Sequence, residues 1–246
     1  MGHKGIDATD AQLEDVSAVA SREPVLGLVV GVGFGAGVFY YKRIAKALGE
    51  GSRGGLMLAH ADLRRVLDAV GAADIAGLTE YLNTMVAALA NAGATLSAIS
   101  SVTTHAYISQ LTPIAPIPII SIFDSVKTEL ETAPGRRIAL FGTRYVIETD
   151  MFGSLPGVDI VRPTEAEVAR IDGAYQGLAV RGYGTAEDRE TFNRIGSALS
   201  KREGVDVILL AGTDLSMLYE SQEPAFPSLD CSVVHIRAIL ERFIKA

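Results

Sequence analysis

The stretch VLGLVVGVGFGAGVFYY, residues 25–41, decides the fold class of this chain. Its first part, Val25 to Gly31, is apolar and rich in β-branched residues, which is typical of a buried strand in a parallel sheet. A glycine-rich turn follows, and residues 39–44 then have helical spacing. The stretch therefore predicts a strand, a turn and the start of a helix. Five glycines interrupt it, so it does not indicate a membrane span.

The same alternation of apolar runs and helical patterns continues to the end of the chain. Strands alternating with helices predict parallel sheets with right-handed crossovers. Further strands are expected at 55–59, 94–100, 118–123, 137–141, 158–161 and 205–210, and helices at 61–70, 78–92, 143–152, 164–177, 186–202 and 230–244.

The expected fold is α/β, with two pseudo-symmetric lobes of parallel sheet flanked by helices. Residues 25–126 and 227–246 form the first lobe in this interpretation, residues 127–226 form the second, and residues 1–24 are a flexible extension. Ligands of open α/β sheets bind outside the carboxyl ends of the strands. We therefore expect the active site in a cleft between the two lobes.

Composition narrows the class of protein. A net charge of −7 over 246 residues, without a basic stripe, argues against a nucleic-acid partner. The single cysteine, Cys231, excludes an intrachain disulfide and fits a reducing cytoplasm. The polar first 23 residues do not read as a secretory signal, and neither they nor any other segment predicts a membrane partner.

Two predicted strands end in small-residue turns that contain threonine. The first turn is Ser101–His105 (SVTTH), and the second is Gly212–Asp214 (GTD). Threonine hydroxyls at such turns, together with neighbouring N–H groups, suit the binding of a substrate carboxylate. The alternative is that each threonine only caps a helix. The four candidates are Thr103, Thr104, Thr143 and Thr213.

Five segments between Leu26 and Arg237 resemble the aspartate/glutamate racemase superfamily, in the same order along the chain. Leu26–Tyr41 resembles its first strand and glycine turn, and residues 94–124 resemble its Cys-Asn-Thr-Ala-His turn with the flanking strands. The resemblance implies a cofactor-independent enzyme that moves the α-proton of a small amino acid or carboxylate, and often a homodimer. The other three segments are LFGTRYVIETD (140–150), VILLAGTD (207–214) and DCSVVHIR (230–237).

The chain departs from this family at both catalytic cysteines. By the resemblance, Ser101 stands at the first cysteine position and Gly212 at the second. A thiol pair on opposite faces of the α-carbon is what racemisation by cysteine requires, so that mechanism is excluded. The related decarboxylases keep a thiol in the second turn, which Gly212 also lacks. Ser101 and Gly212 are expected to leave room for a larger α-substituent or a water molecule.

Acid–base chemistry must then come from other side chains. His60, at the end of the second strand, is the first candidate because its ordinary pKa is near 6.5, although a surface role is the alternative. Ser101 and Asp214 complete the predicted catalytic set. Asp214 replaces a family glutamate, and it could instead stabilise a helix start.

Other polar residues have structural alternatives. His105 is expected to shape its turn, His235 is open between structure and catalysis, and Cys231 is interpreted as packing. Arg144 is a candidate partner for a second substrate carboxylate, as is Arg181, with surface exposure as the alternative for both. Further substrate contacts are expected from Val32, Gly33 and Gly212.

Neither a cofactor nor a metal is predicted. The glycine turn does not keep the G-x-G-x-x-G spacing, since Ala36 stands at its third glycine, and no acidic residue ends the second strand. No cluster has metal-ligand spacing. The leading hypothesis is therefore an isomerase-like enzyme that transfers an α-proton with non-thiol groups. The alternatives are a non-catalytic carboxylate-binding protein and a decarboxylase-like member of the superfamily.

Overall fold

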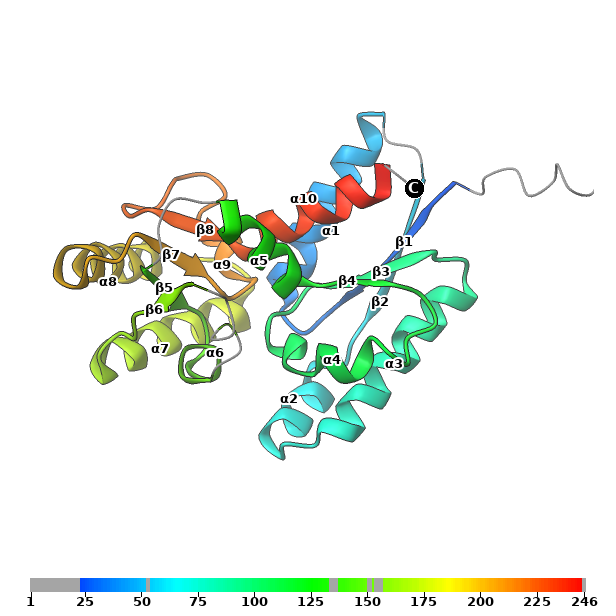
Figure 1. Ribbon diagram of the computed structural model, residues 1–246, viewed down its shortest axis with the longest axis horizontal. Helices are drawn as coiled ribbons and strands as arrows, with labels where there is room; N and C mark the ends of the chain where they lie inside the picture. The colour runs from blue at the N-terminus through cyan, green and yellow to red at the C-terminus, as the bar shows by residue number, and fades with distance from the viewer. Residues whose placement is uncertain (1–22, 52–53, 133–136, 150–151, 153–156, 245–246) are drawn as a thin grey trace, which may run out of the picture.

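Two parallel sheets, each flanked by helices, form the two lobes that the sequence predicts (Figure 1). The computed structural model describes residues 23–51, 54–132, 137–149, 152 and 157–244. The extension expected over residues 1–24 lies, up to residue 22, outside the described residues. Within the described part of the chain, no helix is both long and apolar enough to cross a membrane.

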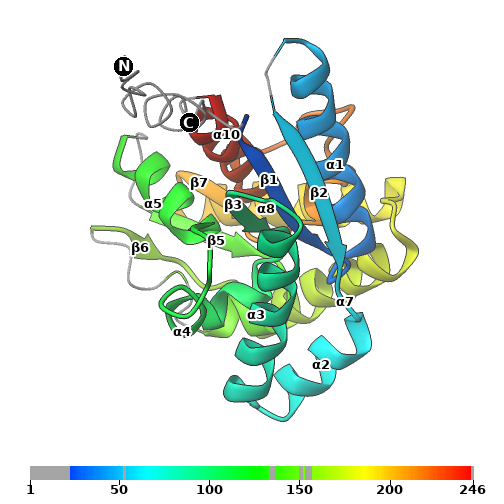
Figure 2. The ribbon, with the colours of Figure 1, turned by 90° about the vertical axis from the view of Figure 1, so that its right-hand side faces the viewer.

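The first sheet has the order β2-β1-β3-β4, with every neighbouring pair parallel. Alternate residues of β1 enter different cores, because successive side chains of a strand point to opposite faces. Leu26, Leu28 and Val30 pack with α1, whereas Val29 packs with α3, so these helices cover opposite faces (Figure 2). The elements of this lobe are β1 (Val25–Val30), α1 (Phe34–Gly49), β2 (Gly55–His60), α2 (Leu63–Gly71), α3 (Ile75–Asn91), β3 (Leu96–Ile99), η1 (Thr103–Tyr107), α4 (Ile108–Leu111) and β4 (Ile119–Ile120).

The second sheet repeats this order as β6-β5-β7-β8, again with parallel pairs. The central strands of both sheets are almost entirely buried, as the apolar runs predict. The remaining elements are α5 (Ile122–Thr132), β5 (Arg137–Phe141), α6 (Arg144–Glu148), β6 (Asp159–Ile160), α7 (Glu165–Arg181), α8 (Ala186–Glu203), β7 (Val207–Leu210), α9 (Leu215–Leu218), β8 (Ser228–Asp230) and α10 (Cys231–Ile244).

Two helices cross between the lobes. The closing helix α10 lies against α1 and α5 (Figure 1), and its Ile236, Ile239 and Phe243 join the core beneath β1. Helix α5 starts at Ile122 and contributes Val126 and Leu130 to the core of the second sheet. The two lobes therefore share packed helices, and this packing fixes the strand ends of one lobe relative to those of the other.

Several elements differ in extent from the expected ranges. The strand expected at 118–123 is only β4, Ile119–Ile120, because the chain already turns into α5 at Ile122. Residues 228–230 form β8 in the second sheet, directly before α10. This edge strand is too short to carry an apolar run, and it follows a proline-rich segment, so the sequence does not identify it.

Candidate functional site

The carboxyl ends of β1, β3, β5 and β7 converge on a cavity of about 310 Å³ between the lobes. Each of the four strands is followed by a turn that contributes to the wall, and helices α2, α6 and α7 supply apolar side chains. Seven of the residues predicted from sequence for the site line this cavity: Val32, Gly33, Ser101, Thr103, Thr143, Thr213 and Asp214.

Asp214 supplies the carboxylate of the cavity wall, and its side chain is only 2% exposed. Its Oδ1 accepts a hydrogen bond from the backbone N–H of Ala36 at 3.0 Å. The carboxylate lies against Gly33, where an added Cβ would come within 2.8 Å of Oδ1, so the approach requires glycine. Burial raises the pKa of Asp214 above its ordinary value, although the Ala36 hydrogen bond acts in the opposite direction.

Tyr175, from α7, donates its hydroxyl to Oδ2 of Asp214 at 3.2 Å. Its ring occupies the space beside Gly212: a Cβ added at 212 would lie 2.8 Å from Cζ and 3.0 Å from the hydroxyl oxygen. The room expected at Gly212 is therefore filled by an aromatic ring. Burial, and then the charge of Asp214, raises the pKa of Tyr175 well above its ordinary value, so this phenol keeps its proton.

Tyr175 is a site residue that the sequence does not predict, as are the aliphatic residues of α2, α6 and α7 in the cavity wall. It lies in the middle of α7, 39 residues before Asp214, and its local pattern is that of an ordinary buried helix position. The only sequence signal is indirect. A glycine at a position expected to carry a side chain leaves a space that a distant aromatic residue can occupy.

Ser101 begins a turn in which Thr104 and His105 make their side-chain hydrogen bonds within the protein. Its Oγ accepts from the N–H of Thr104 at 3.4 Å, and its carbonyl accepts from the Thr104 hydroxyl at 3.0 Å. Thr104 is buried and does not line the cavity, whereas Thr103 does. No described residue accepts the Ser101 proton within hydrogen-bonding distance, so nothing in the described structure activates this hydroxyl as a base.

His105 has a structural position, as the sequence analysis favours. Its Nε2 accepts from the N–H of Ile122 at 3.1 Å, so Nδ1 carries the proton and donates to the carbonyl of Ser101 at 2.6 Å. Burial lowers the pKa of His105 to about 4. The imidazole is therefore neutral near pH 7 and connects the Ser101 turn to α5.

His235 is also fully buried, on α10. Its Nδ1 accepts from the Tyr40 hydroxyl at 2.9 Å, and its Nε2 donates to the carbonyl of Ile120 at 2.9 Å. Burial, and then the nearby His105, lowers the pKa of His235 to about 3. Cys231, at the start of the same helix, is buried, and burial raises the pKa of its thiol. Neither residue lines the cavity.

Thr213 connects the two lobes. Its hydroxyl donates to the carbonyl of Ser100 at 3.2 Å, across 113 residues of chain. Its own carbonyl accepts from the hydroxyl of Ser232 on α10 at 3.3 Å. Thr213 thus lines the cavity and also joins the end of β3 to the end of β7.

Thr143 and Arg144 follow β5 and point to different places. Thr143 lines the cavity, and its Oγ1 accepts from the N–H of Val146, which leaves its own proton free to donate. Arg144 pairs with Glu148 at 2.6 Å and with Glu165 at 2.8 Å, outside the cavity. Hydrogen bonds with Glu165 and Glu148 raise the pKa of this exposed guanidinium.

His60 and Gly212 are not among the residues that line the cavity. His60 is exposed at the end of the edge strand β2, where it shares an exposed face with Leu58. Its ring lies against Gly31, whose φ of 98° belongs to the left-handed region that favours glycine. The catalytic role of His60 remains a prediction without support from its position.

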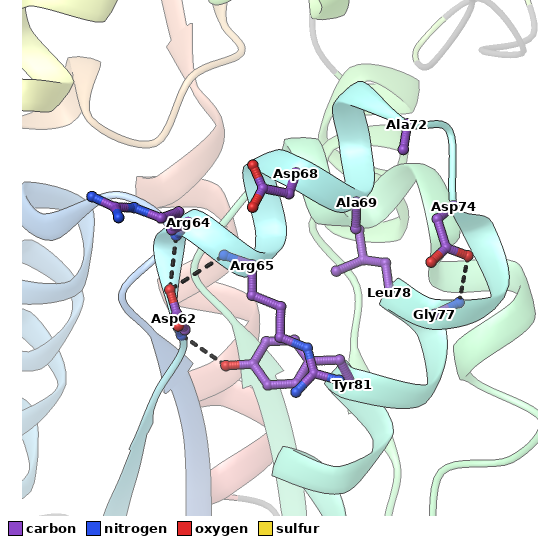
Figure 3. A pocket seen from close by; sticks show the side chains of 10 residues that line it. All are labelled: Asp62, Arg64, Arg65, Asp68, Ala69, Ala72, Asp74, Gly77, Leu78 and Tyr81. Carbon is purple, nitrogen blue, oxygen red and sulfur yellow. Dashed lines mark hydrogen bonds between the residues drawn. The ribbon is translucent and has the colours of Figure 1, made fainter.

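A second hollow lies outside the cavity, between α2 and α3 (Figure 3). Tyr81 accepts a hydrogen bond from the N–H of Asp62 at 2.7 Å, and Arg65 stacks on the Tyr81 ring with its guanidinium carbon 4.1 Å from the centroid. Asp62 in turn caps α2 through the N–H groups of Arg64 and Arg65. These contacts fix the start of α2, the helix that forms one wall of the cavity.

The described residues contain no group of three or more His, Cys, Asp or Glu side chains arranged to hold a metal ion. Within the cavity itself, the described ionisable side chains are Asp214 and Tyr175. The arrangement can therefore bind an anion through hydroxyl groups and exchange a proton through one carboxylate.

The family model described as Asp/Glu/Hydantoin racemase matches residues 29–239 of the chain. A comparison with curated proteins finds no match.

Solved structures with the same fold include two aspartate racemase relatives. One, an aspartate racemase homologue from Pyrococcus horikoshii OT3, superimposes with a TM-score of 0.75 at 20% identity, over 90% of this chain and 99% of the other. The aspartate racemase of Picrophilus torridus gives 0.72 at 16% identity, over 89% and 94%. Glutamate racemase RacE1 from Bacillus anthracis gives 0.61 at 14% identity, over 90% and 82%.

Proposed function

The chain belongs to the Asp/Glu/Hydantoin racemase family. We propose that it transfers the α-proton of a small carboxylate or amino acid without a thiol or a cofactor. The observation that carries the proposal is the buried carboxylate of Asp214 in the wall of the cavity between the lobes. Burial raises the pKa of this carboxyl, which makes it a stronger base than an exposed aspartate.

In the proposed reaction Asp214 removes the α-proton. The electron pair of the C–H bond moves toward the substrate carboxylate and forms an enediolate, and Asp214 becomes neutral. The Tyr175 hydroxyl, 3.2 Å from Oδ2, orients the carboxyl group and keeps its own proton because its pKa is raised. The carboxyl proton of Asp214 exchanges with solvent, and its return to carbon restores the Asp214 carboxylate and completes the cycle.

The opposite wall would hold the substrate carboxylate. Thr103 and Thr143 line the cavity, and the Thr143 hydroxyl has a proton to donate. Ser101 likewise has an unused hydroxyl proton, which can stabilise the negative charge that develops on the enediolate oxygens. Inversion of configuration would additionally need a proton donor on the Ser101 side, whereas Asp214 alone supports exchange with retention.

The test is deuterium exchange at the α-carbon in D₂O, followed by NMR on a panel of amino acids and 2-substituted carboxylates. Asp214→Asn keeps the shape and removes the base, so we expect exchange to fall by about 100-fold or more. Tyr175→Phe should lower it less, because it removes only the orienting hydrogen bond.

His60→Ala compares the base predicted from sequence with the base favoured by geometry. Loss of exchange in His60→Ala, together with normal exchange in Asp214→Asn, would refute the assignment of Asp214. Chiral analysis of the same samples separates inversion from retention.

A non-catalytic binding protein is the second candidate, and one observation favours it. Both oxygens of Asp214 already have a donor within the protein, the Ala36 N–H and the Tyr175 hydroxyl, as in a purely structural carboxylate. Ligand binding without exchange across the whole panel would support this function instead.

A further inference from the structure

The walls of the cavity suit an apolar group. Three helices, one in the first lobe and two in the second, contribute aliphatic side chains to the cavity lining. Leu63 on α2 and Leu67 on the same helix are 43% and 56% exposed, and Val180 on α7 is 87% exposed. The six aliphatic side chains that line the cavity from these helices are Leu63, Val66, Leu67, Val146, Ala179 and Val180.

No cation among the described residues lines the cavity to receive a second carboxylate. The arginines that the sequence analysis considered for this role are paired elsewhere: Arg144 with Glu148 and Glu165, and Arg181 with Asp188. Arg64 and Arg65 are on α2 itself, but they line the outer hollow shown in Figure 3 rather than the cavity.

Among the residues that the structure describes, the one charged group in the cavity lining is an acid, Asp214. A second carboxylate bound near Asp214 would face a like charge in a buried setting, and like charges at close range repel. An apolar group in the same place would instead cover the exposed side chains of Leu63, Leu67 and Val180. Each buried methylene then strengthens binding by roughly fourfold.

We infer that the substrate carries one carboxylate and an apolar α-substituent, such as the side chain of leucine or phenylalanine, which lies between α2 and α7. A cavity of about 310 Å³ is at the small end for ligand pockets, so it fits a single amino-acid-sized molecule. The inference rests on the proposed function in one respect, which is that the α-carbon of the substrate lies beside Asp214.

Calorimetric titration with the L and D forms of leucine, phenylalanine, aspartate and glutamate tests the inference. We expect leucine or phenylalanine to bind at least about tenfold more tightly than either dicarboxylate. Leu67→Arg and Val180→Arg, on opposite walls, add a cation at an exposed position, so each should weaken the apolar ligand and strengthen aspartate or glutamate. Val233→Arg is the matched control, because Val233 is a 45% exposed helical residue outside the cavity.

Equal or tighter binding of aspartate or glutamate to the unmodified protein would overturn the inference, as would no binding of any ligand. An unchanged preference in both Leu67→Arg and Val180→Arg would overturn it as well. The exchange experiment separates this result from the proposed function. If apolar ligands bind but their α-proton does not exchange, the proposed proton transfer is refuted and the inferred substrate class is supported. If aspartate exchanges its α-proton and leucine binds more weakly than aspartate, the proton transfer is supported and the inferred substrate class is refuted.

Discussion

The turns after β3 and β7 occupy equivalent places in the two lobes but find their hydrogen-bond partners differently. In the first turn, Thr104 and His105 direct their side chains to the carbonyl of Ser101, within the same turn. In the second turn, Asp214 receives hydrogen bonds from other elements, the Ala36 N–H of α1 and the Tyr175 hydroxyl of α7.

A pseudo-symmetric backbone therefore need not carry symmetric chemistry. Both sheets have the same strand order, and both turns place a hydroxyl-bearing residue at the cavity. The first turn closes on itself and offers an unactivated Ser101. The second lacks a side chain at Gly212, and the Tyr175 ring takes the vacant space beside a buried carboxylate.

The largest expected effect concerns two buried histidines, His105 in the first turn and His235 on α10. His105 and His235 are neutral in the folded protein, with pKa values lowered to about 4 and about 3, whereas in the unfolded chain they bind a proton near pH 6.5. Their folded pKa lies below the unfolded one, so stability is full above about pH 6.5 and is lost as the pH falls toward 4. We expect a loss of about 2 kcal/mol per histidine at pH 5, measured by urea unfolding at pH 5 and pH 7.

His105→Gln and His235→Gln are the controls for this pH dependence. Each should unfold more easily at pH 7, and each should show a smaller difference between pH 7 and pH 5. The buried carboxyls of Asp214 and Asp230, whose pKa values are raised by burial, act in the opposite sense at the acid end of the range. A stability that is flat between pH 7 and pH 5 in the unmodified protein, and equally flat in both variants, would contradict the structural role of the two imidazoles.

The second effect concerns the space beside Gly212. Gly212→Ala places a Cβ against the Tyr175 ring, so we expect a loss of about 1 to 3 kcal/mol in the free energy of unfolding. Tyr175→Ala in the same chain removes the clash. In a double-mutant cycle, Gly212→Ala should therefore cost less in the Tyr175→Ala background than in the unmodified protein.

Gly173→Ala is the matched control for the glycine substitution, because it lies in α7 with open space around its Cβ position. Alanine is the better helix former, so this variant should gain up to about 1 kcal/mol. Additive costs in the cycle would mean that Tyr175 does not fill the space at 212.

The smallest effect concerns the bond between the two turns. Thr213→Val removes the hydrogen bond to the carbonyl of Ser100 and leaves that carbonyl buried, so we expect a loss of about 1 kcal/mol. Thr112→Val is the control, since the Thr112 hydroxyl bonds only to Ile108 within its own exposed turn. Equal losses in thermal or urea unfolding would show that the bond across the lobes adds nothing beyond a local one.

Much of the fold could be predicted from the sequence because it depends on local patterns. The apolar runs at 25–30, 137–141 and 207–210 are buried central strands, and the helix expected at 78–92 is α3, Ile75–Asn91. The short edge strands were harder to predict. β4 has two residues and β8 has three, too few for a periodicity to identify.

For the site, the sequence could predict which turns come together but not which way each side chain points. Strand ends in parallel sheets meet at one edge, so Ser101, Thr103, Thr143 and Asp214 come together as residues that line one cavity. The direction of a side chain at a strand end depends on its register, and this is why His60 lies on the exposed face of β2.

Residue patterns are enough to assign the α/β class, the turns that meet between the lobes, and the absence of both thiols at Ser101 and Gly212. The folded arrangement is needed to show that Tyr175 fills the place beside Gly212 and that Asp214 is buried against Gly33. The physical reason is range. Hydrophobic periodicity and turn preferences act over a few neighbouring residues, whereas the Asp214 site joins α1, α7 and the turn after β7, and the contact with Ala36 spans 178 residues of chain.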